Sequence, residues 1–191
     1  MTKLILPTLF AVGCVSTTTS DSTQSVSANA CPDNVPAAIA PAADQDLAFV
    51  LAAKGTQNYA CRATATGAAW TFVAPEAGLY AHDDYAEWVG HHYAGPTWEY
   101  EDGSLVVGAR RAGASVDPNS IPWLLLSVVS HVGEGRLSPI TSIQRLETNG
   151  GNAPLTGCDV DHVGATVEVP YTASYFFYKT ANGNSGVRCG G

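Results

Sequence analysis

Charged residues, and basic ones in particular, are scarce in this 191-residue chain. Asp, Glu, Lys and Arg together make up 14% of it, with nine scattered Lys and Arg against 17 Asp and Glu, so the formal net charge is −8. Because no basic stripe exists, the chain lacks the electrostatic footprint of a nucleic-acid-binding protein, and we expect no nucleic acid as a partner. The acidic balance also disfavours docking on an anionic membrane through charge alone.

Helical periodicity and catalytic signatures are missing as well. No long stretch repeats apolar residues at the spacing of an amphipathic helix. The sequence contains no G-x-S-x-G motif of a serine hydrolase and no C-x-x-C pair of the kind that holds zinc. We therefore expect a binding or structural protein rather than an enzyme.

The N-terminus is typical of a bacterial export signal. Lys3 precedes a short apolar run, residues 4–13 (LILPTLFAVG), which cannot span a bilayer. Small residues then precede Cys14 and resemble a lipobox, which predicts that residues 1–13 are a lipoprotein-type signal peptide and that Cys14 carries lipid. The alternative is cleavage after Ala30, which ends an Ala-Asn-Ala sequence.

The rest of the chain divides into two parts by composition. Residues 14–45 are rich first in Ser and Thr and then in Ala and Pro, and they predict a tether. Residues 46–191 have the apolar content of a single β domain. We expect an exported protein, either a cell-envelope lipoprotein held on the membrane by its lipid or an extracellular protein.

The cysteine count agrees with export. Five cysteines leave one odd, and if Cys14 carries lipid, the other four can form two disulfides in any of three pairings. We favour Cys31–Cys189, which would tie the two ends of the domain, and Cys61–Cys158, which would join two inner segments. Each bridge would stabilise the fold by about 2–4 kcal/mol by restricting the unfolded chain, and an exported protein meets an oxidising environment.

Short strands separated by Gly and Pro turns dominate the domain. The expected strands are residues 47–53, 56–62, 69–73, 97–101, 105–109, 121–129, 140–146 and 165–178. Lys54-Gly55 is expected to form a turn, and Pro75 to end a strand. Asp102-Gly103 predicts a tight hairpin whose two turn residues both have φ > 0. The nearly continuous apolar run at 121–129 predicts a central strand buried on both faces. The fold class is therefore all-β, an antiparallel sandwich or flattened barrel stapled by two disulfides.

Five ordered stretches together resemble a known family. They are GTQNYACRA (55–63), HHYAGPTWEYEDGSLVVG (91–108), IPWLLL (121–126), SIQRLETNGGNAPLTGCD (142–159) and VPYTASYFFY (169–178). The chain, from about residue 47 to 178, resembles a secreted bacterial and fungal family catalogued as domain of unknown function 3455. The resemblance implies an exported, β-rich single domain and supplies no activity. A malate dehydrogenase label borne by some fungal relatives does not fit, because the Gly-rich strand-to-helix turn of a nicotinamide site is missing.

A histidine-rich stretch is the first candidate site. His82, His91 and His92 lie near three carboxylates, Asp83, Asp84 and Glu87. Imidazole and carboxylate together can hold Zn or Cu or supply an acid–base pair. Adjacent residues of a strand point to opposite faces, however, so His91 and His92 cannot both bind one ion from regular β structure. We expect no cofactor, and a Zn or Cu site is the alternative.

Two further features have a structural and a functional interpretation. Asp159, Asp161 and His162 follow a cysteine, and we expect the carboxylates to cap turn amides there. Arg145 lies in an expected strand, where a charged side chain is usually solvated. If it is buried it needs a carboxylate partner, and Glu99 and Asp159 are the candidates. Arg145 would then form a structural ion pair or anchor an anionic ligand site.

The aromatic residues of the matched stretches suggest a ligand groove. Aromatic side chains with a polar tip often line such grooves. The candidate lining is His92, Trp98, Glu99, Trp123 and Arg145. The sequence thus favours a non-catalytic envelope module that binds a small molecule, glycan or protein. An envelope metalloprotein or enzyme that uses the cluster around His82–His92 is the alternative, and a structural domain without a ligand is the third possibility.

Overall fold

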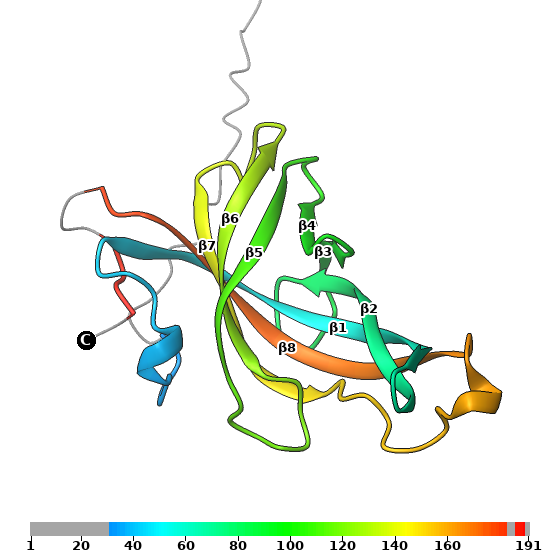
Figure 1. The fold of residues 1–191 in the computed structure, drawn as a ribbon. Helices are drawn as coiled ribbons and strands as arrows, with labels where there is room; N and C mark the ends of the chain where they lie inside the picture. Colours follow the sequence, from blue (N-terminus) through cyan, green and yellow to red (C-terminus); the bar gives the residue numbers. More distant parts are fainter. Residues whose placement is uncertain (1–30, 183–185, 190–191) are drawn as a thin grey trace, which may run out of the picture.

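Eight antiparallel strands form one sheet that closes on itself as a barrel. The computed structural model describes residues 31–182 and 186–189. The strands are β1 (Gln45–Thr64), β2 (Gly67–Tyr80), β3 (Trp88–Tyr93), β4 (Thr97–Tyr100), β5 (Leu105–Ala114), β6 (Trp123–Val132), β7 (Ile140–Gly150) and β8 (Thr166–Thr180). Each strand pairs with its sequence neighbours, and β8 pairs with β1 to complete the ring (Figure 1). The expected all-β, disulfide-stapled fold is confirmed, and its form is a closed barrel.

The long strand β1 replaces the two short strands expected at residues 47–53 and 56–62, whereas β8 lies close to the expected strand at residues 165–178. Lys54 and Gly55 form no turn, because β1 continues through them and Gly55 pairs with Ala77 on one side and Tyr171 on the other. A Cβ atom at Gly55 would lie 2.1 Å from the Glu76 carbonyl oxygen. Glycine is therefore required here by the close approach of two backbones, and the prediction of a turn was wrong.

Proline 75 likewise does not end its strand. β2 runs through Pro75, which pairs with Gln57, and a register irregularity follows at Asn58 and Tyr59 of β1. A proline fits within a strand where the ladder is already irregular, because the missing N–H then removes no regular hydrogen bond.

The predicted hairpin at Asp102-Gly103 forms between β4 and β5, with a different turn. Only Gly103 of the pair has positive φ, at 84°. The Gly103 amide donates to the Tyr100 carbonyl and the Tyr100 amide to the Ser104 carbonyl, both at 2.9 Å. This is the three-residue loop in which a left-handed glycine forms a bulge after a type I turn. The Asp102 carboxylate fixes it by accepting from the amides of Ser104 and Arg136.

The loop between β6 and β7 closes one end of the barrel. Leu137 of this loop is fully buried, and its amide donates to the Ser104 hydroxyl at 3.0 Å. The Arg136 guanidinium lies 4.5 Å from the ring centroid of Phe49 and 5.3 Å from that of Tyr100. These cation–π contacts place a charged side chain across an apolar floor. The interior is therefore filled at this end.

A strap, residues 31–44, crosses the outside of the barrel. It contains the 3-10 helix η2 (Ala37–Ile39), and Ile39 is fully buried in a second apolar cluster outside the ring. The cluster's other buried members are Leu47, Leu146, Phe176 and Tyr178. Burial of Ile39 contributes about 1.5–3 kcal/mol. The strap consists of residues that the composition assigned to the tether at residues 14–45. Residues 1–30, with Cys14 and the expected signal peptide, lie outside the described residues.

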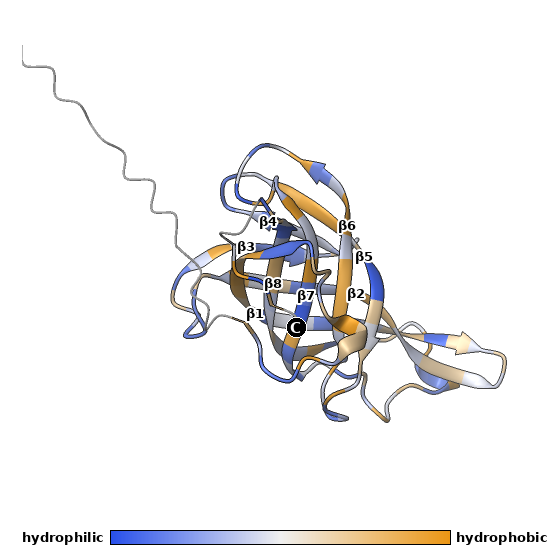
Figure 2. Ribbon diagram, turned by 90° about the vertical axis from the view of Figure 1, so that its left-hand side faces the viewer, coloured by the Kyte–Doolittle hydropathy of each residue, from blue (hydrophilic) through white to orange (hydrophobic). Residues whose placement is uncertain are grey.

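The strap also explains the apolar run at β6, which stands out as hydrophobic in Figure 2. Leu124 and Leu126 line the interior, whereas Trp123 and Leu125 pack toward the outer cluster. Both faces of β6 are thus covered in its first half only, since Val129 near its end is 62% exposed. The expectation of a strand buried on both faces throughout was wrong.

Both favoured disulfides are present. Cys31 pairs with Cys189 across 158 residues, and Cys61 pairs with Cys158 across 97 residues. The second bridge ties the loop between β7 and β8 to β1. Two disulfides are compatible with an exported protein. Among the described residues, no helix has the length and apolar character needed to cross a membrane.

Candidate functional site

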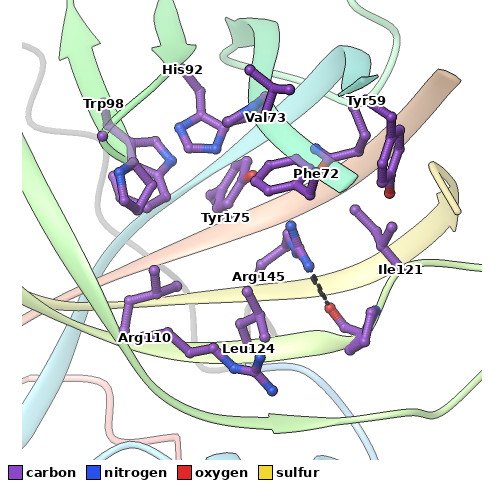
Figure 3. Close-up of a pocket in the computed structure, with 16 residues that line it drawn as sticks. Tyr59, Phe72, Val73, His92, Trp98, Arg110, Ile121, Leu124, Arg145 and Tyr175 are labelled. Atoms are coloured by element: carbon purple, nitrogen blue, oxygen red, sulfur yellow. Dashed lines mark hydrogen bonds between the residues drawn. The ribbon is translucent and has the colours of Figure 1, made fainter. Parts of the chain in front are cut away.

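The end of the barrel opposite the closed floor opens into a pocket of about 510 Å³ (Figure 3). All eight strands contribute at least one side chain to its wall. Most of this wall is aromatic or aliphatic, with Tyr59, Phe72, Trp98, Leu124, Leu126 and Tyr175 as its main members. A volume of this size suits one small molecule.

His92 and Trp98 form one side of the pocket as a cross-strand pair. They lie opposite each other on β3 and β4, and their rings stack with centroids 4.3 Å apart. Tyr175 of β8 meets both rings edge-on, at 5.0 Å from His92 and 5.4 Å from Trp98. The three rings reach each other across the interior because β8 closes the barrel opposite the β3–β4 hairpin. This aromatic wall is a rigid surface that buries a large area at low entropic cost.

His92 is held in one neutral form. Its Nδ1 lies 2.8 Å from the carbonyl oxygen of Thr97, and a carbonyl can only accept, so Nδ1 carries the proton. Burial lowers the pKa of His92 to about 3, and the nearby positive charge of Arg145 acts in the same direction, while the hydrogen bond to Thr97 opposes them. At neutral pH the other ring nitrogen, Nε2, is therefore unprotonated and can only accept a hydrogen bond.

Arg145 reaches the pocket from β7. Its Nε and Nη2 donate to the carbonyl oxygen of Pro122, at 3.3 and 2.8 Å (Figure 3). The expected carboxylate partners are elsewhere. Glu99 is exposed and accepts from the Tyr93 hydroxyl at 2.9 Å, and Asp159 contacts His162 at 2.6 Å. In the part of the chain that the structure describes, no ion pair includes Arg145.

The tyrosines near Arg145 stay protonated. Burial raises the pKa of Tyr175 and raises that of Tyr171 well above its usual value, and the Arg145 charge acts against both rises. Their hydroxyls lie 3.3 Å apart, so either can donate to the other. Trp98 adds a third polar atom: its Nε1 is buried with no hydrogen-bond partner among the described residues. The pocket thus offers several donors set in an apolar wall.

Three of the five residues proposed as a groove do line the pocket: His92, Trp98 and Arg145. Glu99 does not, because it alternates with Trp98 on β4 and projects to the outside. Trp123 does not either, because it packs toward the outer cluster under the strap. Both were expected in the groove, and the structure places them on the other face of their strands.

The histidines near β3 are spread over different surfaces. His91 is exposed on the outer face, as the strand alternation predicted, and His82 lies in the loop before β3, 3.8 Å from Glu87. Across residues 31–182 and 186–189, no group of three or more His, Cys, Asp and Glu side chains is arranged to hold a metal ion. The structure therefore does not bring His82, His91 and His92 together.

The Asp159 cluster has the structural role expected for it. Asp159 precedes the 3-10 helix η3 (Val160–His162), and its Oδ1 accepts from the Asp161 amide at 3.0 Å. The hydrogen bond from His162 lowers the pKa of the Asp159 carboxyl, and further hydrogen bonds to it act in the same direction. The adjacent Cys158 is bridged to Cys61, so it offers no free thiol.

Several lining residues were missed by the sequence analysis. Tyr175 could have been identified by the alternation of its strand, since it continues the face of Tyr171 and Ala173. Alternation did not mark Leu124, which lies in a continuous apolar run, or Phe72, whose neighbour Val73 also lines the pocket. Gln57 and Tyr59 were missed because a turn was predicted at Gly55. In the structure both residues belong to β1, which continues through Gly55.

Comparison with known families gives one result. The model of the family described as "Protein of unknown function (DUF3455)" matches residues 41–179, and the chain belongs to this family. The matched range begins in the strap and includes β1 to β7 and all but the last residue of β8. No curated protein and no solved structure gives a significant match.

Proposed function

We propose that this DUF3455 protein is an exported, non-catalytic binding protein that takes one small, largely apolar molecule into its barrel. The observation that carries the proposal is the pocket of about 510 Å³, walled by aromatic and aliphatic side chains at the open end of a closed barrel. An eight-stranded barrel has an interior of the right width for one small ligand. Ligand sites are typically apolar cavities of 300–1,000 Å³, roughly, with a few oriented polar groups.

The chemistry of the lining supports binding over catalysis. Within the described residues, the pocket wall contains no Asp, Glu, Lys, Ser, Thr or Cys that could act as a nucleophile or pair with a base. His92 is its one imidazole, and with a pKa of about 3 it is a weak base far from the range useful for proton transfer near neutral pH. A small molecule is favoured over a glycan or a protein because the site is a concave, mostly apolar pocket inside the barrel.

The proposed location is the cell envelope, with the lipid on Cys14 as the link to the membrane. The two disulfides support an oxidising compartment, and the apolar run at residues 4–13 supports export. Replacement Cys14→Ser is expected to move the protein from the membrane fraction to the soluble fraction of the same cells. An unchanged distribution would refute the anchor and leave the binding proposal standing.

A neutral fluorescent probe tests the pocket. N-phenyl-1-naphthylamine is small and apolar, and its emission rises in a dry environment. We expect it to bind the oxidised protein at one site. The variant Leu124→Trp, which fills the pocket, should weaken binding at least tenfold. The matched control Leu125→Trp, one residue along β6 and facing the outer cluster, should bind as the wild type does.

Two results would contradict the proposal. One is the absence of saturable probe binding by the folded wild-type protein. The other is equal binding by wild type and by a folded Leu124→Trp variant, because the probe would then occupy a surface outside the pocket. Near-ultraviolet circular dichroism, which reports the packed aromatic interior, establishes whether each variant is folded.

A further inference from the structure

The pocket carries a positive charge that the protein does not balance. Both hydrogen bonds from Arg145 go to the neutral carbonyl of Pro122, which orients the guanidinium without neutralising it. The ion pairs within the described chain join His82 to Glu87, His162 to Asp159 and Arg188 to Asp46. Arg145 is part-buried in its contact with Pro122, so its charge is only partly relieved by water.

The charge of the pocket lining is opposite in sign to that of the chain as a whole. The chain has 17 acidic and nine basic residues, yet the pocket lining contains two arginines, Arg145 and Arg110, and no acidic residue. The charge of Arg145 reaches across the interior, because it acts on the ionisation of Tyr59, His92 and Tyr175, which come from three different strands. A cleft of one sign with apolar walls concentrates its field on whatever enters.

The geometry of Arg145 leaves room for a two-oxygen anion. A guanidinium has five N–H donors, and Pro122 occupies one on Nε and one on Nη2. Nη1 and the outer hydrogen of Nη2 remain for the neighbouring Tyr175 hydroxyl and for a ligand. The free edge formed by Nη1 and Nη2 is one of the two guanidinium edges that can bind a carboxylate through two parallel hydrogen bonds. Trp98 Nε1, buried without a partner in the described residues, also needs an acceptor.

We infer that the ligand is an amphipathic carboxylate: a small molecule with an apolar, preferably aromatic body and one carboxylate group. The carboxylate binds Arg145, and the body packs against the aromatic wall of Trp98, His92 and Phe72. The inference rests on the proposed function and adds the chemical class of the ligand. Neutral molecules of the same shape bind less tightly, because they leave the Arg145 charge desolvated and unpaired.

A pair of matched probes tests this on the unmodified protein. 2-Naphthoate and 2-naphthamide have the same ring system and nearly the same size and differ in charge. Isothermal titration calorimetry with the oxidised wild-type protein at neutral pH is expected to show at least tenfold tighter binding of 2-naphthoate. Equal binding of the two, or tighter binding of the amide, would overturn the inference while leaving the proposed function intact.

Variants then assign the preference to one residue. In Arg145→Gln the two probes should bind equally, with the affinity for 2-naphthamide within about threefold of wild type. The control Arg62→Gln removes the same charge from an exposed position on β1 and should keep the full preference. Arg145→Lys, which keeps the charge and loses the planar fork, should keep part of it.

The outcomes separate the two proposals. A folded Arg145→Gln variant that still prefers 2-naphthoate would refute the role of Arg145. If Arg145→Gln does not fold, the comparison of the probes on wild type and on Arg145→Lys still decides the matter. A preference that is reduced but not lost in Arg145→Lys supports the planar fork, and an undiminished preference would refute it. Failure of both naphthyl probes and of N-phenyl-1-naphthylamine to bind would instead refute the pocket as a ligand site.

Discussion

The buried neutral imidazole of His92 makes the stability of the fold depend on pH in a calculable way. In the folded protein its pKa is lowered to about 3, chiefly by burial, whereas a histidine in an unfolded chain titrates at about 6.5. Between about pH 6.5 and pH 3 the imidazole is therefore protonated in the unfolded state and neutral in the native state. The stability conferred by the neutral ring is fully present above about pH 6.5 and is lost as the pH falls toward 3.

The magnitude follows from the width of that window. One pKa unit corresponds to about 1.4 kcal/mol. Between about pH 7.5 and pH 4.5 the His92 contribution should fall by about 3 kcal/mol, and it continues to fall to about pH 3. The carboxyls of Asp102, Asp117 and Asp159 have lowered pKa values, so their contributions are lost mainly below their usual value of 3.8. The range above about pH 4.5 therefore isolates the imidazole.

The assay is guanidinium chloride unfolding, followed by tryptophan fluorescence, at a series of pH values without reductant. The variant His92→Gln cannot titrate, so its free energy of unfolding should fall by about 3 kcal/mol less than that of wild type between about pH 7.5 and pH 4.5. His91→Gln is the matched control, since its side chain is exposed on the opposite face of β3, and it should follow wild type. If wild type and His92→Gln lose stability in parallel, the imidazole is not buried as described and the aromatic wall is wrong.

Two further predictions concern the strap and the second disulfide. The Gln144 amide donates to the Ile39 carbonyl and accepts from the Tyr178 hydroxyl, both at 2.6 Å. Gln144→Leu should lower the free energy of unfolding by about 2–5 kcal/mol, because it leaves two buried groups unpaired. A double-mutant cycle with Tyr178→Phe should show a coupling energy of at least about 0.5 kcal/mol. Strict additivity would contradict the hydrogen bond between Gln144 and Tyr178. Replacement of Cys61 and Cys158 together by Ser should lower stability by about 2–5 kcal/mol, as measured by thermal unfolding, and an unchanged midpoint would show that the bridge does not constrain the unfolded chain.

Local signals allowed much of the fold to be predicted. The hairpin at Asp102-Gly103 was identified because a short turn is specified by the few residues within it, although the turn type was wrong. Cysteine parity left three pairings open, and the favoured one, which ties the two ends of the domain, is the one present. Gly55 illustrates the limit. A glycine between two expected strands is compatible with a turn and with close backbone contact, and only the partner strand, whose Glu76 carbonyl oxygen would lie 2.1 Å from a Cβ there, decides between them.

Closure of the barrel could not be predicted from any local pattern. It depends on the pairing of β1 with β8, in which Thr56 lies opposite Pro170, more than a hundred residues away. The same limit applies to the site. Glu99 was included in the groove with Trp98, although adjacent residues of β4 lie on opposite faces of the strand. Trp123 was assigned to the groove as an aromatic residue of a matched stretch, and the strap beside which it packs had been assigned to the tether.

The charge of Arg145 is the feature for which sequence reasoning and structure differ most instructively. The sequence predicted either a solvated side chain or a buried one with a carboxylate partner, whereas the structure shows a part-buried guanidinium that donates to the Pro122 carbonyl. The acidic residues that give the chain its charge of −8 do not line the pocket. In about 0.1 M salt the field of surface charges fades within about 10 Å, whereas a desolvated contact to Arg145 is screened much less. The repulsion of an anion by the acidic exterior is therefore weak in salt, and the attraction inside the barrel persists. A pocket of this kind selects by the functional group that reaches Arg145, and the apolar wall around Trp98 supplies affinity without distinguishing acids from their neutral analogues.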